Sequence, residues 1–260
     1  MERSFGEQGG KLSYGSYLKV PEILAAQVLE SDPPAHDEML FIITHQAYEL
    51  WFKQAIFELE SVREALFAGD TLAARHLMTR VAAIERVMIE HIGVLETMSP
   101  QAFLEFRHNL APASGFQSVQ FREMEFISGI KDDRYFTRLE MSEVELARLH
   151  KRFDEPTLWD AFCTLLESRG LPMPADSEET RHASLLTMAQ DPKYLDEFFT
   201  SEALLSHDEQ FSLWRYRHVL MVERQIGTKS GTGGSAGAPY LRSTLSKRFF
   251  PELWEIRSSL

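Results

Sequence analysis

The order of apolar and polar positions predicts a chain built from one helix after another. Residues 37–69 carry apolar side chains at helical spacing, and Gly69 ends that pattern. Most polar positions of this stretch share one side, so its wide apolar face predicts burial against more than one neighbour. A second helix is predicted from Thr71 to about Met98.

Helix caps and breakers divide the next part of the chain. Ser99 followed by Pro100 is a helix cap with proline at the first helical position, and it opens a short helix. Pro112 and Gly115 interrupt the helical pattern, which then resumes and runs to Gly129.

The remaining sequence also favours helices. Residues 131–200 are predicted to be helical in pieces, with a surface loop at residues 170–179, "GLPMPADSEE". Alternating runs rich in Val, Ile and Thr are absent, and no repeat or low-complexity linker divides the chain. We therefore predict an all-α fold with a single helical-bundle domain over residues 1–260.

One helix carries a histidine in the middle of its most apolar face, in the stretch "FSLWRYRHVLMV". At about 100° per residue, His218 falls near the centre of an apolar arc about 100° wide. The arc contains Phe211, Trp214, His218, Met221 and Val222, and outside it lie Arg215, Arg217, Glu223 and Arg224. A buried imidazole needs partners for its ring nitrogens, because an unpaired buried polar group costs about 1–3 kcal/mol. The pattern fits a core histidine paired with backbone, and it also fits an axial ligand to haem.

A glycine-rich segment follows this helix. Gly231, Gly233 and Ala236 match the dinucleotide-binding pattern G-x-G-x-x-A, but that pattern must follow a strand, and this one follows a helix. We therefore reject a nucleotide site here. Five glycines make residues 227–239 flexible, and the segment is either a plain linker or a mobile lid that orders over a ligand.

Two further side chains are candidates for binding chemistry. His45 lies at the border of its helix's apolar arc beside Phe41, where it either faces an apolar cavity or pairs with Glu49 one turn on. Arg107 lies one turn from Phe103 on the short helix. Arginine binds carboxylates in a bidentate fashion, although a single arginine is more often solvated.

Composition excludes several classes of function. The formal net charge of −12 argues against a nucleic-acid or anionic-membrane partner, which would need clustered Lys and Arg. The single cysteine, Cys163, excludes an internal disulfide and fits a reducing compartment. We find neither a signal peptide at the start of the chain nor an apolar run long enough to span a bilayer, so we expect a cytoplasmic protein without a membrane partner.

Six sequence blocks, taken together, closely resemble the tryptophan 2,3-dioxygenase family. They occur in the family's order and cover the chain except for roughly residues 130 to 205. The blocks are "YGSYL" (14–18), "HDEMLFIITHQAYELW" (36–51), "FRHNLAPASGFQS" (106–118), "QFSLWRYRHV" (210–219), "GTGGSAG" (231–237) and "FFPELWEIR" (249–257).

This resemblance implies an all-helical haem b enzyme assembled as a homotetramer, a dimer of dimers. The N-terminal segment, residues 1–35, is expected to contact a neighbouring subunit. By motif position, His218 is the proximal iron ligand, and His45 hydrogen-bonds the indole N–H from the distal side. Arg107 binds the substrate carboxylate and Thr232 holds the amino-acid end. The other expected pocket residues are Phe41, Leu110, Ser114, Gly115 and Tyr14, together with Tyr17 from the neighbouring chain.

The implied reaction joins L-tryptophan and O2 into N-formyl-L-kynurenine by cleaving the indole C2–C3 bond at ferrous haem. A haem mono-oxygenase acting on a modified indole is the nearest alternative. A non-catalytic haem carrier or gas sensor would share His218 but would have no use for Arg107 and Thr232. A di-iron bundle is disfavoured, because its two Glu-x-x-His pairs occur on a short helix and in a polar stretch. These pairs are Glu105 with His108 and Glu179 with His182.

Overall fold

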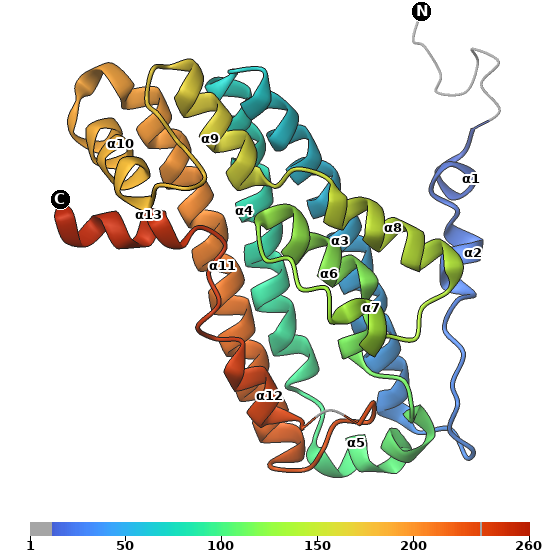
Figure 1. Cartoon of the computed structure of the whole chain (residues 1–260). Coiled ribbons are helices and arrows are strands. Elements are labelled where there is room, and N and C mark those ends of the chain that lie inside the picture. Colours follow the sequence, from blue (N-terminus) through green and yellow to red (C-terminus); the bar gives the residue numbers. More distant parts are fainter. Residues whose placement is uncertain (1–11, 235) are drawn as a thin grey trace, which may run out of the picture.

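Three long helices form the centre of the molecule. The structure is a computed structural model that describes residues 12–234 and 236–260. Helix α4 (Thr71–Leu95) packs against both α3 (His36–Phe67) and α11 (Leu195–Ile226), as Figure 1 shows. No strand occurs in the described residues, and the predicted all-α class is confirmed.

The predicted turn between the first two long helices is confirmed. Gly69 has a φ of 75°, which glycine adopts without steric cost, so the chain reverses directly after α3. The Asp70 side chain then accepts a hydrogen bond from the Ala73 backbone N–H at 2.9 Å and caps α4. Leu59, Val62 and Leu66 of α3 are fully buried, because this face packs against more than one neighbour.

The segment that follows α4 lies at the bottom of the molecule in Figure 1. Ser99 caps α5 (Pro100–Phe106) through the Ala102 backbone N–H at 3.1 Å, as its sequence predicts. A 3-10 turn η1 (Arg107–Leu110) and a second turn η2 (Gly115–Gln117) lead into α6 (Val119–Ser128). These short elements bring the start of α6 onto α3, where the Ser118 hydroxyl donates to Glu49 at 2.6 Å.

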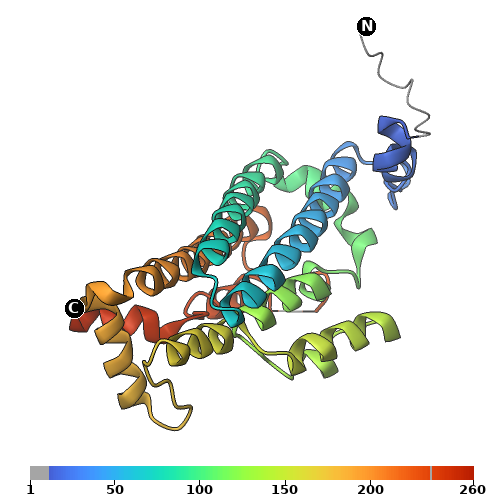
Figure 2. The same ribbon diagram turned by 90° about the horizontal axis from the view of Figure 1, so that it is seen from above.

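Shorter helices cover the outside of this core. They are α7 (Tyr135–Arg138), α8 (Glu143–Asp154), α9 (Leu158–Ser168), α10 (Glu178–Gln190), η3 (Pro192–Tyr194), α12 (Ala238–Ser243), α13 (Pro251–Glu255) and η4 (Ile256–Ser259). In Figure 2, α8 lies on the opposite side of the molecule from α4. The predicted surface loop at residues 170–179 is only partly correct, because Leu171 and Met173 are 4% and 5% exposed and pack into the core.

The N-terminal helices stand apart from the rest. Helices α1 (Tyr14–Leu18) and α2 (Val20–Leu24) contain no buried residue and project away from the other helices in Figures 1 and 2. The linker behind them is held on α3, where the Gln46 Nε2 donates to the Ala26 carbonyl at 2.9 Å. Glu38 accepts hydrogen bonds from the backbone N–H groups of Glu30 and Ser31. The base of this arm is therefore fixed, while its tip has no partner within the described chain.

Two neighbouring residues of α11 tie the fold together far from either end of the helix. His207 is fully buried, and its two ring nitrogens contact Glu85 of α4 at 2.6 Å and Ser128 of α6 at 2.8 Å. Asp208 accepts hydrogen bonds from the backbone N–H groups of Phe249 and Phe250, at 2.9 and 3.1 Å. The C-terminal segment is thereby fastened to the central helix.

Within the part of the chain that the structure describes, no helix is long and apolar enough to cross a membrane.

Candidate functional site

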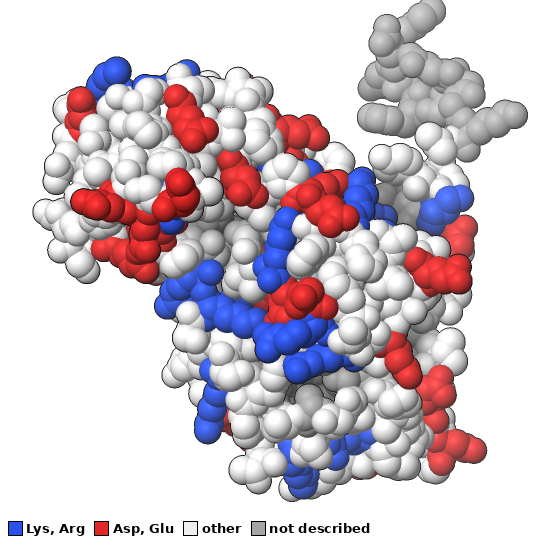
Figure 3. Space-filling view, in the orientation of Figure 1, with Lys and Arg blue, Asp and Glu red and all other residues white. Residues whose placement is uncertain are grey.

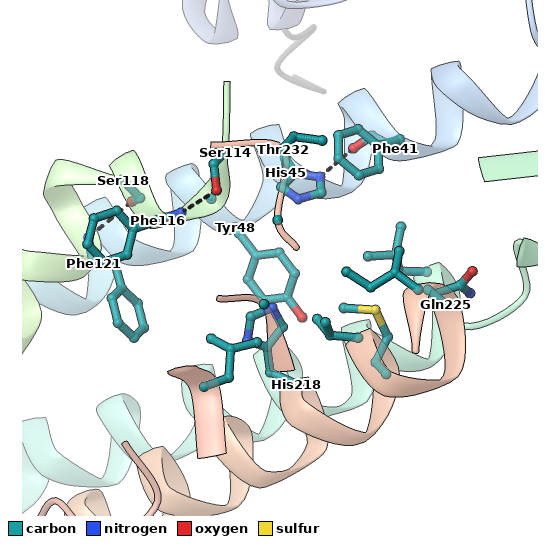
Figure 4. Close-up of a pocket in the computed structure, with 18 of the residues that line it drawn as sticks. Phe41, His45, Tyr48, Ser114, Phe116, Ser118, Phe121, His218, Gln225 and Thr232 are labelled. Carbon is teal, nitrogen blue, oxygen red and sulfur yellow. Dashed lines mark hydrogen bonds between the residues drawn. The ribbon is translucent and has the colours of Figure 1, made fainter. Parts of the chain in front are cut away.

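A cavity of about 270 Å³ lies between α3, α11 and the loops that follow α4 and α11. Figure 4 shows His45 of α3 and His218 of α11 on opposite walls of this cavity. Phe116, Ser118 and Phe121 stand at one end, and Phe41 and Gln225 at the other. The apolar walls consist of Phe41, Tyr48, Phe52, Leu95, Met98, Phe103, Phe116, Phe121, Trp214, Met221 and Val222. The cavity therefore offers flat apolar surface between two imidazoles.

His218 lies in the apolar face that the sequence predicts for it. Its ring stacks on the Trp214 indole at 5.0 Å between centroids, and its remaining exposure is to the cavity. No group among the described residues hydrogen-bonds either ring nitrogen. Burial and, to a smaller extent, the charge of His45 together lower the pKa of His218 to about 4, so the ring is neutral at ordinary pH. A neutral imidazole with a free lone pair is the form that binds iron.

His45 is held in one tautomer by its own helix. Its Nδ1 lies 2.7 Å from the Phe41 carbonyl oxygen, which only accepts hydrogen bonds, so Nδ1 carries the proton. The lone pair of Nε2 is then left as an acceptor. Burial lowers the pKa of His45 and outweighs the opposing effects of the Phe41 carbonyl and Glu49. The alternative pairing of His45 with Glu49 is wrong, because Glu49 instead accepts a hydrogen bond from the Ser118 hydroxyl at 2.6 Å.

The glycine-rich segment is seated against the loop that follows η1. The Thr232 hydroxyl donates to the Ala113 carbonyl at 2.6 Å, and the Arg107 Nη2 donates to the Ser230 carbonyl. A Cβ on Gly233 would lie 2.6 Å from the Ser114 Cβ, closer than real side chains approach, so only glycine fits there. Lid mobility over residues 227–239 stays a prediction, and Ser235 lies outside the described residues.

The structure brings together most of the predicted site residues. Seven of them line the cavity, namely Phe41, His45, Arg107, Ser114, Gly115, His218 and Thr232. Leu110 does not line it and packs against the core. Tyr14 and Tyr17 are 79% and 70% exposed on α1, away from the cavity of their own chain. Residues 1–11 of the predicted N-terminal contact segment lie outside the described residues.

Sequence reasoning missed a buried charged group at the α6 end of the cavity. Arg215, which lies outside the apolar arc of its helix, is nevertheless only 4% exposed. Its Nη2 donates to Glu125 Oε1 at 2.8 Å, and the Arg122 Nη1 donates to Glu125 Oε2 at 2.7 Å. Both arginines line the cavity. The helix period alone gave no signal for Arg215, because its position is set by a partner on another helix.

The candidate metal ligand is a single side chain. Among the described residues, no three His, Cys, Asp or Glu side chains gather as ligands for a bare metal ion. His218 instead suits an iron whose equatorial positions are filled by a macrocycle. The neutral ring, its unpartnered nitrogens and the flat apolar walls all fit a haem group.

Comparisons with known proteins cover the whole chain. The family model described as tryptophan 2,3-dioxygenase matches residues 2–174 and 175–260. The tryptophan 2,3-dioxygenase of Nocardioides sp. is 57% identical over 263 residues, which cover 99% of this chain and 98% of that protein. The proteins of the same name from Herpetosiphon aurantiacus and Pseudomonas fluorescens are 44% and 39% identical, over 96% of this chain. They cover 98% and 91% of those relatives.

Proposed function

Because this chain belongs to the tryptophan 2,3-dioxygenase family, we propose that it cleaves the C2–C3 bond of the indole ring of L-tryptophan. Both atoms of O2 enter the product, N-formyl-L-kynurenine, in the first step of tryptophan degradation by the kynurenine pathway. The observation that carries the proposal is the pair of neutral imidazoles, His45 and His218, on opposite walls of one apolar cavity.

The cofactor in this proposal is haem b, held through the iron by His218 as the proximal ligand. Its ferrous iron supplies the reactivity toward O2 when it is bound. The free nitrogens of His218 and the stacked Trp214 support this assignment. Since one molecule of O2 and one of tryptophan give one product, the reaction consumes no net electrons and needs no reductase site.

His45 orients the substrate in this proposal. Its Nε2 is an acceptor, since Nδ1 is occupied by the Phe41 carbonyl, and the indole N–H is the donor that it suits. The aromatic ring of Phe41 stacks against Phe103 at 5.7 Å and provides a flat wall for the indole. The imidazole acts by orienting and polarising the indole, while its own proton stays on Nδ1 against the Phe41 carbonyl.

Arg107 and Thr232 recognise the amino-acid end. Arg107 uses one N–H on the Ser230 carbonyl, and its other donors are free to hold a carboxylate in a bidentate pair. Thr232 reaches the same region from the glycine segment, where its hydroxyl is anchored on Ala113. Because both residues join the loops that border the cavity, they close the site against water when the substrate is in place. Ser114 and Gly115 line the same border, and Leu110 supports it from the core.

A homotetramer, a dimer of dimers, belongs to the same proposal. Leu12, Tyr14, Tyr17 and Leu24 of the N-terminal arm are each at least 70% exposed. An arm with a fixed base and apolar side chains that have no partner among the described residues of their own chain suits docking on a second subunit. In this proposal Tyr17 contributes to the substrate site of the neighbouring subunit, and Tyr14, which is exposed on the same helix α1, accompanies it there. We also place the enzyme in the cytoplasm, where a lone cysteine stays reduced.

The test is to supply L-tryptophan and air to the ferrous, haem-loaded protein and to determine the product by absorbance and mass. Gain of two oxygen atoms, with the absorption of N-formylkynurenine, is expected. Gain of one oxygen atom would contradict dioxygenation and would support the mono-oxygenase. If the protein did not bind haem at all, the proposed function would be contradicted.

The substrate end of the site has its own test, in the variant Arg107→Gln. Loss of a hydrogen-bonded ion pair is expected to weaken L-tryptophan binding about 10- to 100-fold. Tryptamine, which has no carboxylate, is the matched ligand and should bind the variant and the unchanged protein alike. Equal weakening of both ligands would show that Arg107 acts on the shape of the loop and not on the carboxylate.

A further inference from the structure

The short turn η1 carries Arg107 but does little to fix its own position. It has only four residues, and no side chain caps its start. A 3-10 turn of this length has few internal hydrogen bonds, so its neighbours must hold it in place. On one side, the Arg107 Nη2 donates to the Ser230 carbonyl of the glycine-rich segment. On the other side, the Asn109 Nδ2 donates to the Glu30 carbonyl at 2.9 Å. Asn109 thus fastens the turn to the base of the N-terminal arm.

Glu30 is a firm anchor for this bond. Its backbone N–H donates to Glu38 Oε1 at 2.7 Å, and the Ser31 backbone N–H donates to Glu38 Oε2 at 3.1 Å. Glu38 is 1% exposed and lies in the first turn of α3. Hydrogen bonds to an ionised carboxylate are among the stronger ones in proteins, so the backbone of residues 30 and 31 is held on α3. Because α3 forms one wall of the cavity, Asn109 joins η1 to that wall.

The surroundings of Arg107 explain the use of such a tether. Arg107 is half-buried, and Glu30 and Asp32 of the nearby linker are exposed. Figure 3 shows acidic side chains along the lower right edge of the molecule, where this linker runs in Figure 1. A guanidinium that swings freely on a short turn can pair with surface carboxylates in place of a ligand. A fixed turn keeps the arginine at the cavity, and a pre-oriented donor loses less conformational entropy when the ligand binds.

We propose that Asn109 is a positioning residue for substrate binding, which holds Arg107 at the cavity through its hydrogen bond to Glu30. This inference rests on the proposed function, in which Arg107 binds the carboxylate of L-tryptophan. Asn109 does not line the cavity, so it has no ligand contact of its own. An amide suits this place, because its Nδ2 donor reaches a backbone carbonyl without adding a charge beside the guanidinium. Only the carboxylate end of the substrate is expected to depend on this bond, since the indole is held by His45.

The first experiment measures two ligands on one variant. In Asn109→Ala the chain is expected to fold, because the lost contact lies at the surface, where water can replace it. Binding of L-tryptophan and of tryptamine, which has no carboxylate, is followed by the haem absorbance of the haem-loaded full chain without O2. L-Tryptophan should bind about 3- to 10-fold more weakly, and tryptamine should stay within about twofold of the unchanged protein. Equal weakening of both ligands, or no weakening of L-tryptophan, would overturn the positioning role.

The second experiment asks whether Asn109 acts through Arg107. In Arg107→Gln the substrate carboxylate has already lost its partner, so adding Asn109→Ala should weaken L-tryptophan binding by less than about 1.5-fold more. Losses that multiply in the double variant would show an independent effect and would contradict the inference.

The matched control removes another hydrogen bond to the same linker. Gln46→Ala abolishes the 2.9 Å bond from the Gln46 Nε2 to the Ala26 carbonyl and leaves Asn109 in place. L-Tryptophan binding should stay within about twofold of the unchanged protein. A loss as large as that of Asn109→Ala would show that general loosening of the arm is the cause, against a specific role of Asn109.

Failure of the proposed function is a separate outcome of these measurements. If the unchanged, haem-loaded protein does not bind L-tryptophan, the proposed function is contradicted and the inference falls with it. If L-tryptophan binds the unchanged protein and Asn109→Ala with equal affinity, the positioning role alone is overturned.

Discussion

Two histidines about three turns apart on α11 have opposite surroundings. His207 is fully buried, and both of its ring nitrogens have partners, Glu85 and Ser128. His218 borders a cavity, and neither of its nitrogens has a partner among the described residues. A core histidine is thus recognised by its complete set of hydrogen bonds. An imidazole left unsatisfied at a cavity indicates a missing ligand.

The comparison is tested most severely by removing the cavity histidine. His218→Ala is expected to lose tightly held haem and all measurable turnover, because the other histidine that lines the cavity, His45, lies on the opposite wall. The fold should survive, since the substitution breaks no hydrogen bond within the described chain. Haem absorbance and far-ultraviolet circular dichroism of the purified variant measure both effects. Normal haem retention would refute His218 as the ligand.

Removing the core histidine should have the opposite outcome. His207→Ala leaves Glu85 buried without its partner and is expected to reduce the free energy of unfolding by about 3–5 kcal/mol. The folded fraction should still bind haem. Denaturant unfolding measures the loss. Ser128→Ala removes only a neutral hydrogen bond and serves as a control, with an expected loss of about 1 kcal/mol.

The third histidine, on the opposite wall, should show an intermediate effect. His45→Ala is expected to lower kcat/KM for L-tryptophan about tenfold, the equivalent of one hydrogen bond to the indole N–H. Haem should remain bound, because His45 is not its proximal ligand. Steady-state kinetics at saturating O2 provide the measurement. Complete loss of turnover, with haem and tryptophan both still bound, would contradict an orienting role.

The smallest effect is expected from pH. A histidine with the ordinary pKa of 6.5 is half protonated at that pH, but burial lowers the pKa of His45, and nearby His91 lowers it further against the effect of Glu49. Its Nε2 therefore stays an acceptor, and kcat/KM should change by less than about twofold between pH 8 and pH 6.5. The unfolded chain takes up the proton first, so the contribution of His45 to the free energy of unfolding falls as pH drops below 6.5. A sigmoid loss of kcat/KM centred at pH 6.5, absent from His45→Ala, would show an unshifted pKa.

The sequence predicted what depends on neighbours along the chain. The end of α3 at Gly69, the cap at Ser99 and the apolar face around His218 follow from local preferences, and all three are confirmed. The burial of Arg215 depends on Glu125, which lies on another helix, and no helical period reveals such a partner. Likewise, Leu171 packs into the core, although the sequence of residues 170–179 predicts a surface loop.

The same distinction between local and tertiary information applies to the residues of the candidate site. His45 and Arg107 were singled out by their place beside aromatic residues, and both line the cavity. Their roles came from motif resemblance, because the distances between α3, η1 and α11 are properties of the folded chain. Leu110 was expected in the pocket, but it is partly buried against the core and does not line the cavity. Motif order therefore located the right segments but not each side chain's direction.

Asp208 accepts hydrogen bonds from Phe249, Phe250 and Trp254, and these bonds have a consequence for the order in which the chain folds during synthesis. All three donors follow α11 in the chain and are synthesised after it, whereas the carboxylate they satisfy lies in the helix that carries His218. Until these three donors have been synthesised, burial of Asp208 would leave an unpaired carboxylate in the interior. Helix α11 is therefore expected to reach its final packing after α3 and α4 have paired, so the cavity around His218 is completed only once residues 249–254 have been translated.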